Sequence, residues 1–554
     1  MSEQHLSSIE KVKQASDALR GTIKEGLADE ITGAISEDDK ALVKFHGMYM
    51  QDDRDRREER AEKKLERLYS FMIRLRLPGG LLSAEQWLAT QDIAGEHSTG
   101  VIKITTRQTI QLHGLYKSHV KPTIRAFNEA KLHSIATCGD INRNVICSAH
   151  PRQSPIHKQV HDFSFKIDEL LLPRTKAYYE IWLDGEKLAD KKEEEDPLYQ
   201  DRYLPRKFKI AIAIPPNNDV DVFGNDLGLI AIIENDQLKG FNIAIGGGLS
   251  STHGNPATYP RLATVIGFVS GEEKILKTIY EIVMIQRDHG NRSDRSLARL
   301  KYTLDKMGIE WFKTEIARRT GFPLEKEKPF LFTDRKDYYG WFQNNDQLWY
   351  YTPFIENGRV TDNEKAALKT ALYEIAATRK LNFRFTANQN VILADIRDED
   401  KISIEKILKK YRIEEYTESI SSIRKNSMAC VALSTCPLAF AEAQRYLPAL
   451  ISKIEPLLKK NGLHQEDIIL RMTGCPNGCA RSYIAEIGFI GTALGKYNLQ
   501  LGGDHTGMRL NKVYKESLDE TAILQELDLL FSRFAKERNA KESFGDFAIR
   551  KKLV

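Results

Sequence analysis

Four of the six cysteines in this 554-residue chain stand in two close pairs. Cys430 and Cys436 form a C-x5-C spacing, and Cys475 and Cys479 form a C-x3-C spacing. Four thiolates brought together suit a [4Fe–4S] cluster, in which each iron takes one sulfur, and they also suit zinc. C-x5-C lies outside the usual range of a zinc knuckle, and the second pair is rich in Pro, Gly and Asn. The spacing therefore favours an iron–sulfur cluster over zinc, and zinc over four inert thiols.

The other two cysteines, Cys138 and Cys147, lack such neighbours and are expected to be ordinary buried thiols. The first residues, MSEQHLSSIEKVKQ, lack the apolar core of a signal peptide, and no stretch reaches the ~20 apolar residues of a membrane span. We therefore expect a cytoplasmic protein without structural disulfides and without a membrane partner. The net charge, 82 − 77 = +5, gives no indication of a nucleic-acid partner.

The elements that must position the cysteines belong to an internal repeat. The segment from LRLPGGLLSAEQW to VIKITTRQTIQLHG resembles the later segment from PFIENGRVTDNEKAALKTALYEIA to NFRFTANQNVILAD. Each copy predicts a strand, a turn, an N-capped helix and an alternating strand. Five positions match in register: Gly80 with Gly358, Ser83 with Thr361, Lys103 with Arg384, Thr105 with Thr386, and Gln108 with Gln389. The matches indicate duplication.

A second duplicated unit follows each copy of the first. FKIAIAIPPNND through FNIAIGGG parallels DIILRMTGCPNGC through YNLQLGG, so that the chain consists of two halves with one plan. We predict an α+β fold of mixed sheets and helices, whose halves pack about a pseudo-twofold axis with a site between them. The Gly-rich stretches match no nucleotide-binding pattern, and we expect their glycines to permit close backbone approach, against a cofactor.

Two charged runs are interpreted as solvated surface. Residues 51–68 interleave both charge signs and predict an exposed helix with ion pairs between residues four apart. The run DKKEEED at 190–196 predicts an exposed loop.

Taken in order, several motifs resemble the sulfite and nitrite reductase family. They are the two cysteine pairs, RLPGG, NRNV, LPRKFK, TGCPNGC and the duplicated ITTRQT and FTANQN strands, and the similarity runs over essentially the whole chain. The stretch KFHGMYMQDDRD at 44–55 resembles the NADPH-dependent sulfite reductase branch of that family. The division that we predict is an N-terminal arm (1–68), a duplicated ferredoxin-like domain (69–135 and 343–417), a first cofactor-binding domain (136–342) and a second one with the cysteines (418–554).

The resemblance implies six-electron reduction of sulfite to sulfide at sirohaem coupled to a [4Fe–4S] cluster. It places the cluster on Cys430, Cys436, Cys475 and Cys479, and gives Cys479 a second role as ligand of the sirohaem iron. Substrate-binding cations fall on Arg74, Arg143, Lys207 and Lys209 by the same matching. The candidates for holding sirohaem are Lys103, Arg107, His113, Lys301, Gln389 and Asn390, where Lys103 replaces an arginine that is frequent in relatives.

Local patterns agree with several of these roles. Read as a strand, LPRKFKIAIAIPP places Lys207 and Lys209 on one face with Ala211 and Ala213, which leaves room for a planar ligand. The R-L-R before the Pro-Gly-Gly turn predicts Arg74 and Arg76 on a common face, where one or both could meet an anion. Without the resemblance, a surface ion pair would be the better explanation of these residues.

Electrons must come from a separate protein, because the chain shows neither a dinucleotide fingerprint nor a flavin-binding segment. The resemblance points to a flavoprotein subunit that oxidises NADPH, and the arm of residues 1–68 either docks that partner or wraps its own domains. Assimilatory nitrite reduction and ferredoxin-dependent sulfite reduction are the alternatives on the same fold. A cluster-only electron carrier would need a far shorter chain.

Overall fold

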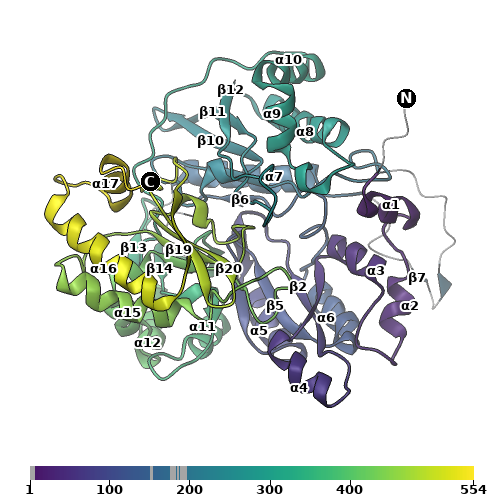
Figure 1. The fold of residues 1–554 in the computed structure, drawn as a ribbon. Coiled ribbons are helices and arrows are strands. Elements are labelled where there is room, and N and C mark those ends of the chain that lie inside the picture. Colours follow the sequence, from purple (N-terminus) through teal and green to yellow (C-terminus); the bar gives the residue numbers. More distant parts are fainter. Residues whose placement is uncertain (1–5, 150–153, 175–181, 184–185, 188–195) are drawn as a thin grey trace.

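The computed structural model describes residues 6–149, 154–174, 182–183, 186–187 and 196–554. Over these residues the chain forms four five-stranded sheets, a short hairpin of β7 (Trp182–Leu183) with β8 (Glu186–Lys187), and helices that cover the sheets. The N-terminal, central and C-terminal parts of the chain form three lobes around a common centre (Figure 1). The predicted α+β fold with duplicated halves is confirmed.

The first two sheets exchange an edge strand. Strand β3 lies in the first half of the chain but pairs with β16 of the second half, with Leu82 opposite Phe383. In return β15 of the second half pairs with β4 of the first, with Arg359 opposite Lys103. The sheets are β1-β2-β5-β4-β15, made of Met48–Asp52, Tyr69–Arg74, Ile110–Leu115, Ile102–Ile104 and Arg359–Val360, and β13-β14-β17-β16-β3, made of Gly340–Gln343, Trp349–Thr352, Val391–Ile396, Asn382–Phe385 and Leu81–Ser83.

The exchange rests on matching turns. Gly80 precedes β3 with φ of +76°, and a side chain there would meet Gln108. Gly358 precedes β15 with φ of +71°, and a side chain there would meet Gln389. Both glutamines also have positive φ, +51° and +71°. The register predicted from the repeat is therefore the register in space.

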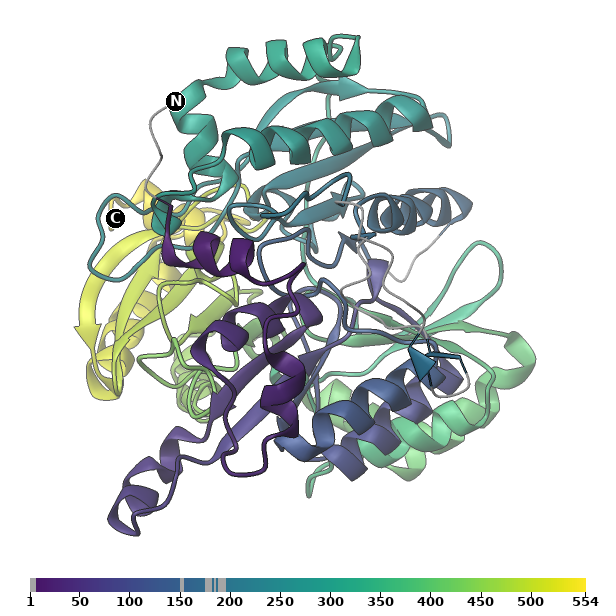
Figure 2. The same ribbon diagram turned by 90° about the vertical axis from the view of Figure 1, so that its right-hand side faces the viewer.

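Helices from both halves cover these sheets and share one core. Ser83 begins α5 with a capping box to Gln86, as the predicted N-cap requires. Trp87 of α5 stacks on Phe383 of the other half at 4.5 Å between ring centroids. Figure 2 shows the two sets of helices side by side: α5 (Ala84–His97), α6 (Lys117–Glu129), α11 (Leu368–Ala377) and α12 (Asp398–Lys410).

The third and fourth sheets also repeat one plan. Each has two parallel pairings followed by antiparallel ones. The third is β12-β11-β10-β9-β6, made of Thr264–Val269, Gln237–Ile245, Leu227–Glu234, Ile210–Ala213 and Ile146–Cys147, and the fourth is β18-β19-β20-β21-β22, made of Ser427–Ala429, Leu470–Thr473, Ile487–Ala493, Lys496–Leu501 and Lys512–Leu518. Their main helices are α7 (Pro155–Leu170), α8 (Glu272–His289), α9 (Leu300–Met307), α10 (Ile309–Thr320), α14 (Ser422–Lys425), α15 (Leu447–Lys460), α16 (Glu520–Glu537) and α17 (Phe544–Arg550). Helix α13 (Ile413–Ser419) packs instead on α12 and on β13 of the second sheet.

The glycines that end β11 and β21 approach protein backbone. A side chain at Gly247 would strike the carbonyls of Phe223 and Asn225, and one at Gly503 would strike those of Ala485 and Ile484. The expectation of close approach is therefore correct. The neighbour found there is the chain's own backbone, and an approach to a cofactor stays a prediction.

A buried charged cluster joins the two halves at equivalent positions. Asp221 and Arg481 are 260 residues apart, as are the first residues of β9 and β19, and both begin a 3₁₀ turn with positive φ. Arg481 pairs with Asp221 at 3.0 Å, and Arg471 and Arg335 pair with the same carboxylate at 2.6 and 3.1 Å. Burial disfavours the carboxylate, but the three guanidinium groups still hold the pKa of Asp221 below its usual range.

The N-terminal arm packs on the chain's own domains. Its strand β1 extends the first sheet, and its elements are α1 (Ser8–Ala15), α2 (Ile23–Ala28), α3 (Glu37–Leu42) and α4 (Arg57–Glu62). Lys13 and Glu10 are buried, and Glu10 pairs with Arg292 at 2.6 Å. The helix predicted over 51–68 is shorter than expected, because β1 and a 3₁₀ turn occupy its start, but the Glu59–Lys63 pair of residues four apart forms at 2.8 Å. The boundary at residue 68 stays a prediction.

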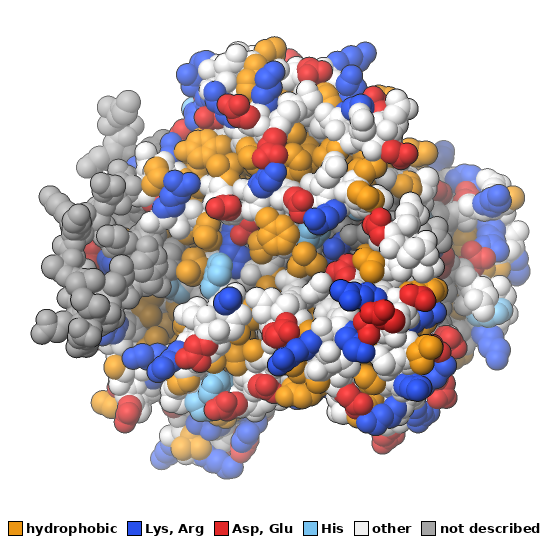
Figure 3. Space-filling view, turned by 180° about the vertical axis from the view of Figure 1, so that it is seen from behind, with side chains coloured by type: hydrophobic (Ala, Val, Ile, Leu, Met, Phe, Trp, Pro, Cys, Tyr) orange, Lys and Arg blue, Asp and Glu red, His pale blue; other side chains and the backbone are white. Residues whose placement is uncertain are grey.

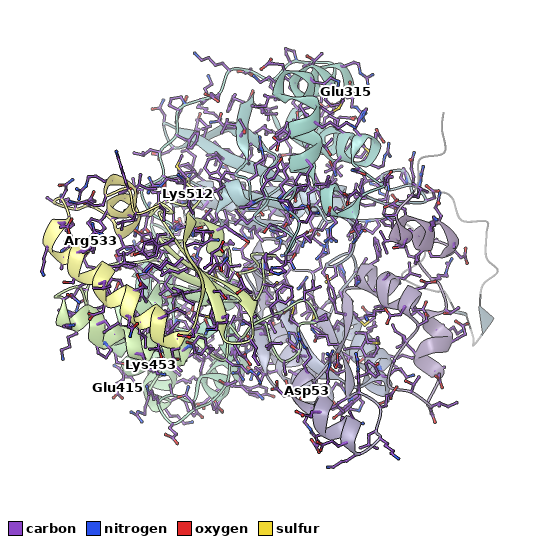
Figure 4. The ribbon with its side chains drawn as sticks, in the orientation of Figure 1. Asp53, Glu315, Glu415, Lys453, Lys512 and Arg533 are labelled. Carbon is purple, nitrogen blue, oxygen red and sulfur yellow. The ribbon has the colours of Figure 1, made fainter. Side chains whose placement is uncertain are left out.

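Charged side chains of both signs are interspersed on the face seen in Figure 3, and residues such as Glu315 and Arg533 lie at the outer edge of their lobes (Figure 4). No helix of the described residues is long and apolar enough to cross a membrane.

Of the predicted loop at 190–196, residues 190–195 lie outside the described part of the chain. Asp196 is buried and not exposed, because its carboxylate accepts hydrogen bonds from the N–H groups of Arg174, Leu198 and Tyr199.

Candidate functional site

The four predicted cluster cysteines lie in the loops after β18 and β19. Cys430 directly follows β18, and its N–H donates to the Met472 carbonyl of β19 at 3.2 Å. Burial raises the pKa of Cys430, Cys436 and Cys475, to about 12 for Cys436, and the charge of Cys479 adds to all three shifts. Such thiols become thiolates at neutral pH when a metal replaces the proton.

The four thiols influence one another electrostatically, since the charges of Cys475 and Cys479 both raise the pKa of Cys430 and of Cys436. Within the described residues, no three Cys, His, Asp or Glu side chains converge closely enough to hold a single metal ion. The assignment of these four thiols to one cluster stays a prediction.

Lys207 and Lys209 face the cysteine loop. Burial, and then Lys209 and two arginines, hold the pKa of Lys207 well below its usual value, while Cys479 opposes the shift. Burial, Arg107 and Arg299 lower the pKa of Lys209 to about 7, again against Cys479. The charge of Lys209 thus lowers the pKa of Lys207, and the charge of Cys479 raises the pKa of both lysines, as a shared site requires.

The strand that follows these lysines is shorter than predicted. Strand β9 covers Ile210–Ala213 only, so both lysines stand in the extended segment before it. The alternation itself is confirmed, since Phe208, Ile210 and Ile212 join one apolar cluster and Ala211 and Ala213 another. The alanines do not leave room for a ligand, because Ile146, Val222 and Phe223 fill the space beside them.

Arg74 and Arg143 meet at one backbone carbonyl. Nη1 of Arg143 donates to the Thr137 oxygen at 3.0 Å and Nη1 of Arg74 lies 3.4 Å from it. Arg74 also donates to the Cys138 thiol at 3.1 Å, so this cysteine is buried as predicted but borders the cation cluster. The predicted common face with Arg76 is wrong: β2 ends at Arg74, and Arg76 turns to Asp168, which accepts from its Nε at 2.8 Å.

Arg107 connects the arginines to the lysines. It donates to the carbonyl of Ile210, next to Lys209, at 3.0 Å, and to Asn225 at 2.8 Å. Burial and the charge of Arg143 lower its pKa to about 9. Five buried or half-buried cations thus form one group: Arg74, Arg107, Arg143, Lys207 and Lys209. The charge of Cys479 acts on its two lysines.

Lys103 and His113 lie on the first sheet near this cluster. Lys103 donates to the Asn357 carbonyl, and burial lowers its pKa to about 7 although Cys430 opposes the shift. Burial, Lys103 and Arg74 lower the pKa of His113 to about 3, so its ring is neutral at physiological pH. Gln389 donates to the carbonyl of Ala429, adjacent to Cys430, at 3.1 Å.

The remaining two candidates are occupied by protein partners. The Lys301 ammonium donates to the carbonyls of Gly248, Ser250 and Tyr259. The Asn390 amide donates to Asp337 at 2.7 Å and accepts from the Ile355 N–H at 2.9 Å. Their cofactor contacts stay predictions.

Sequence reasoning missed two residues that hold Lys209. The Asp226 carboxylate accepts from the Lys209 N–H at 2.9 Å and pairs with Arg299 at 2.7 Å. In the other half Glu486 accepts from the Ile469 N–H at 2.9 Å, again 260 residues later. The duplication could have revealed this acidic position, whereas no motif marks Arg299.

The chain is similar in sequence to known proteins over nearly its whole length. Family models described as the nitrite and sulphite reductase 4Fe-4S domain and the nitrite/sulfite reductase ferredoxin-like half domain match residues 164–324 and residues 64–130 with 342–411. A Leptospira biflexa protein named sulfite reductase (NADPH) hemoprotein beta-component is 62% identical, with 97% of each chain covered. A Staphylococcus saprophyticus protein of the same name is 51% identical over 99% of this chain and 96% of that one.

A solved structure extends the likeness to three dimensions. That of the Mycobacterium tuberculosis NirA protein has a TM-score of 0.79 and 25% sequence identity, and covers 98% of this chain and 96% of that one. The duplicated sheets, the cysteine loops and the full-length similarity together place the chain: it belongs to the nitrite and sulfite reductase family.

Proposed function

We propose that this chain reduces sulfite to sulfide with six electrons, at a sirohaem coupled to a [4Fe–4S] cluster, in sulfate assimilation and cysteine biosynthesis. The observation that carries the proposal is the group of five cations, two of which, Lys207 and Lys209, interact with the charge of Cys479. Burying cations that outnumber their carboxylate partners costs free energy of folding unless an anion binds among them. Relatives at 50–62% identity over nearly the whole chain bear a sulfite reductase name.

The residues present fit both cofactors. Cys430, Cys436, Cys475 and Cys479 would hold the cluster, and Cys479, the exposed one of the four, would also reach the sirohaem iron. Lys103, Arg107 and His113 would hold the sirohaem carboxylates and line its pocket, together with Lys301, Gln389 and Asn390. When bound, the two cofactors supply the electrons and the iron that holds the substrate sulfur.

The chain's own cations divide into two roles. Arg74 and Arg143 bind and polarise the oxyanion, because a guanidinium keeps its proton in a protein. Lys207 and Lys209 have lowered pKa values, so they can both bind sulfite oxygens and release protons to them as water leaves. In balanced form, bisulfite takes up six electrons and six protons and yields hydrosulfide and three waters.

The electrons reach this chain from a partner protein. The names of its relatives, beta-component of an NADPH enzyme, support an NADPH-oxidising flavoprotein as that partner. NADPH and flavins would thus act only through the second subunit, in the cytoplasm.

The decisive experiment combines spectrum, metal content and substrate choice. The purified protein should absorb visible light and contain iron and acid-labile sulfide. It should also turn over sulfite at a higher kcat/KM than nitrite. A colourless, iron-free protein that is folded and resists reconstitution would refute the cofactors, and a preference for nitrite would refute the substrate.

A further inference from the structure

A cavity of mixed polar and apolar lining lies away from the residues assigned above. It has a volume of about 760 Å³ and is lined by parts of both halves, including Leu81 and Leu82 of β3, Arg384 of β16 and the start of α7. None of the cysteines, lysines and arginines of the proposed active site lines it. Its volume lies within the ~300–1,000 Å³ that is typical of small-molecule sites.

Two nitrogens of the Arg384 guanidinium are buried at this cavity without a hydrogen-bond partner among the described residues. The side chain is 8% exposed, and its Nε and Nη1 find no acceptor among the described residues. Lys103, at the equivalent position of the first half, donates to the Asn357 carbonyl instead. A buried charge that lacks a partner is costly, so its retention points to a ligand.

The N-terminus of α7 points its positive end to the same cavity. This helix has 16 residues and no acidic residue in its first turn, and its cap Ser154 lines the cavity. Burial and the charge of Arg384 lower the pKa of His157 and His161 to about 4, so these rings are neutral near pH 7. A helix N-terminus next to a free guanidinium suits a phosphate group.

The charge of Asp395 acts on Arg384 from beyond ion-pair distance. Asp395 accepts hydrogen bonds from Tyr350 at 3.2 Å and Asn382 at 3.0 Å, and forms no ion pair with Arg384 among the described residues. Asp162 and Asp346 also line the cavity, but both are exposed. The lining also includes the apolar side chains of Leu77, Leu81, Leu82 and Phe165, of which Leu81 pairs with Arg384 across β3 and β16.

We propose that this cavity binds a small organic phosphate, with the phosphate on Arg384 and the α7 N-terminus and the organic part on the apolar side chains of the lining. The cavity exceeds what inorganic phosphate would fill, which is why the ligand carries an organic part. The site is independent of sulfite reduction, so either proposal can fail alone.

Calorimetric titration of the holoenzyme with phenyl phosphate tests the site. Arg384→Gln should weaken binding at least ~10-fold, the loss of a charge-assisted hydrogen bond. Arg143→Gln, which alters the other cation cluster, should leave this affinity unchanged. Lys158→Glu reverses an exposed charge at the rim of the cavity, so this variant should still fold. It should also weaken phenyl phosphate binding several-fold.

Absence of binding to the wild-type protein, or equal binding by the wild-type protein and Arg384→Gln, would overturn the proposal. Inorganic phosphate that binds as tightly as phenyl phosphate would overturn the organic part of it. Sulfite turnover of Arg384→Gln should stay within about twofold of wild type, which separates this site from the active site.

Discussion

Replacing Lys209 by arginine should separate substrate binding from proton delivery. Burial, Arg107 and Arg299 lower the pKa of Lys209 from 10.5 to about 7. The shift of about 3.5 pKa units makes release of its proton easier by about 5 kcal/mol than from a free lysine, at ~1.4 kcal/mol per unit. Arginine keeps the positive charge but does not release a proton, so only the second role should be lost.

The expected effects follow from these roles. Lys209→Arg should lower kcat for sulfite about 100-fold, the low end for general acid catalysis because Lys207 remains, while KM changes little. Lys209→Met also loses a charge-assisted hydrogen bond of about 1.5–3 kcal/mol, so its kcat/KM should fall a further ~10-fold or more. Lys239→Met, on β11 of the same sheet, is the matched control and should behave as wild type.

The pH profile gives a second measurement of the same idea. A donor must carry its proton, so kcat of the wild-type enzyme should fall as the pH rises through the pKa of Lys209. That pKa should lie at or above 7 in the holoenzyme, since an anionic cofactor raises it. The alkaline limb should disappear in Lys209→Arg when kcat is followed with reduced methyl viologen as donor. Full kcat with an unchanged limb in this variant would refute the assignment.

Three further outcomes are expected. Cys475→Ser should lose the cluster and activity by iron and acid-labile sulfide analysis, whereas Cys138→Ser should retain its iron; an active Cys475→Ser protein with full iron would rule out this ligand. The purified chain should reduce sulfite with reduced methyl viologen but not with NADPH alone, and NADPH turnover free of any flavoprotein would contradict the two-subunit scheme. Asp221→Asn should lower the free energy of unfolding by about 3–5 kcal/mol in urea titrations, because three buried arginines lose their counter-charge, and an unchanged midpoint would argue against that cluster.

Features encoded by local spacing or by repetition could be predicted from the sequence. The cysteine pairs identified the cluster ligands as candidates, and the repeat gave the register that Gly80 and Gly358 adopt in space. Side-chain alternation placed Phe208 and Ala211 on opposite faces correctly.

Features that depend on partners distant in the sequence could not be predicted from it. Arg76 turns from Arg74 because Asp168, 92 residues away, offers a buried carboxylate. The space beside Ala211 and Ala213 is filled by side chains from other strands and turns. Arg299 and Asp226 hold Lys209 through a contact that spans 73 residues and follows no motif.

The exchange of β3 and β15 sets a waiting time during synthesis. Strand β4 ends at Ile104, but its outer neighbour β15 begins at Arg359, 255 residues later. At ~5–20 residues per second the ribosome needs about 13–50 s to deliver it. Throughout that interval the edge of β4 lacks its partner, and β3 equally awaits β16. Unpaired edges invite wrong pairing, so nascent chains of this protein should depend on chaperones until residue 385 has emerged.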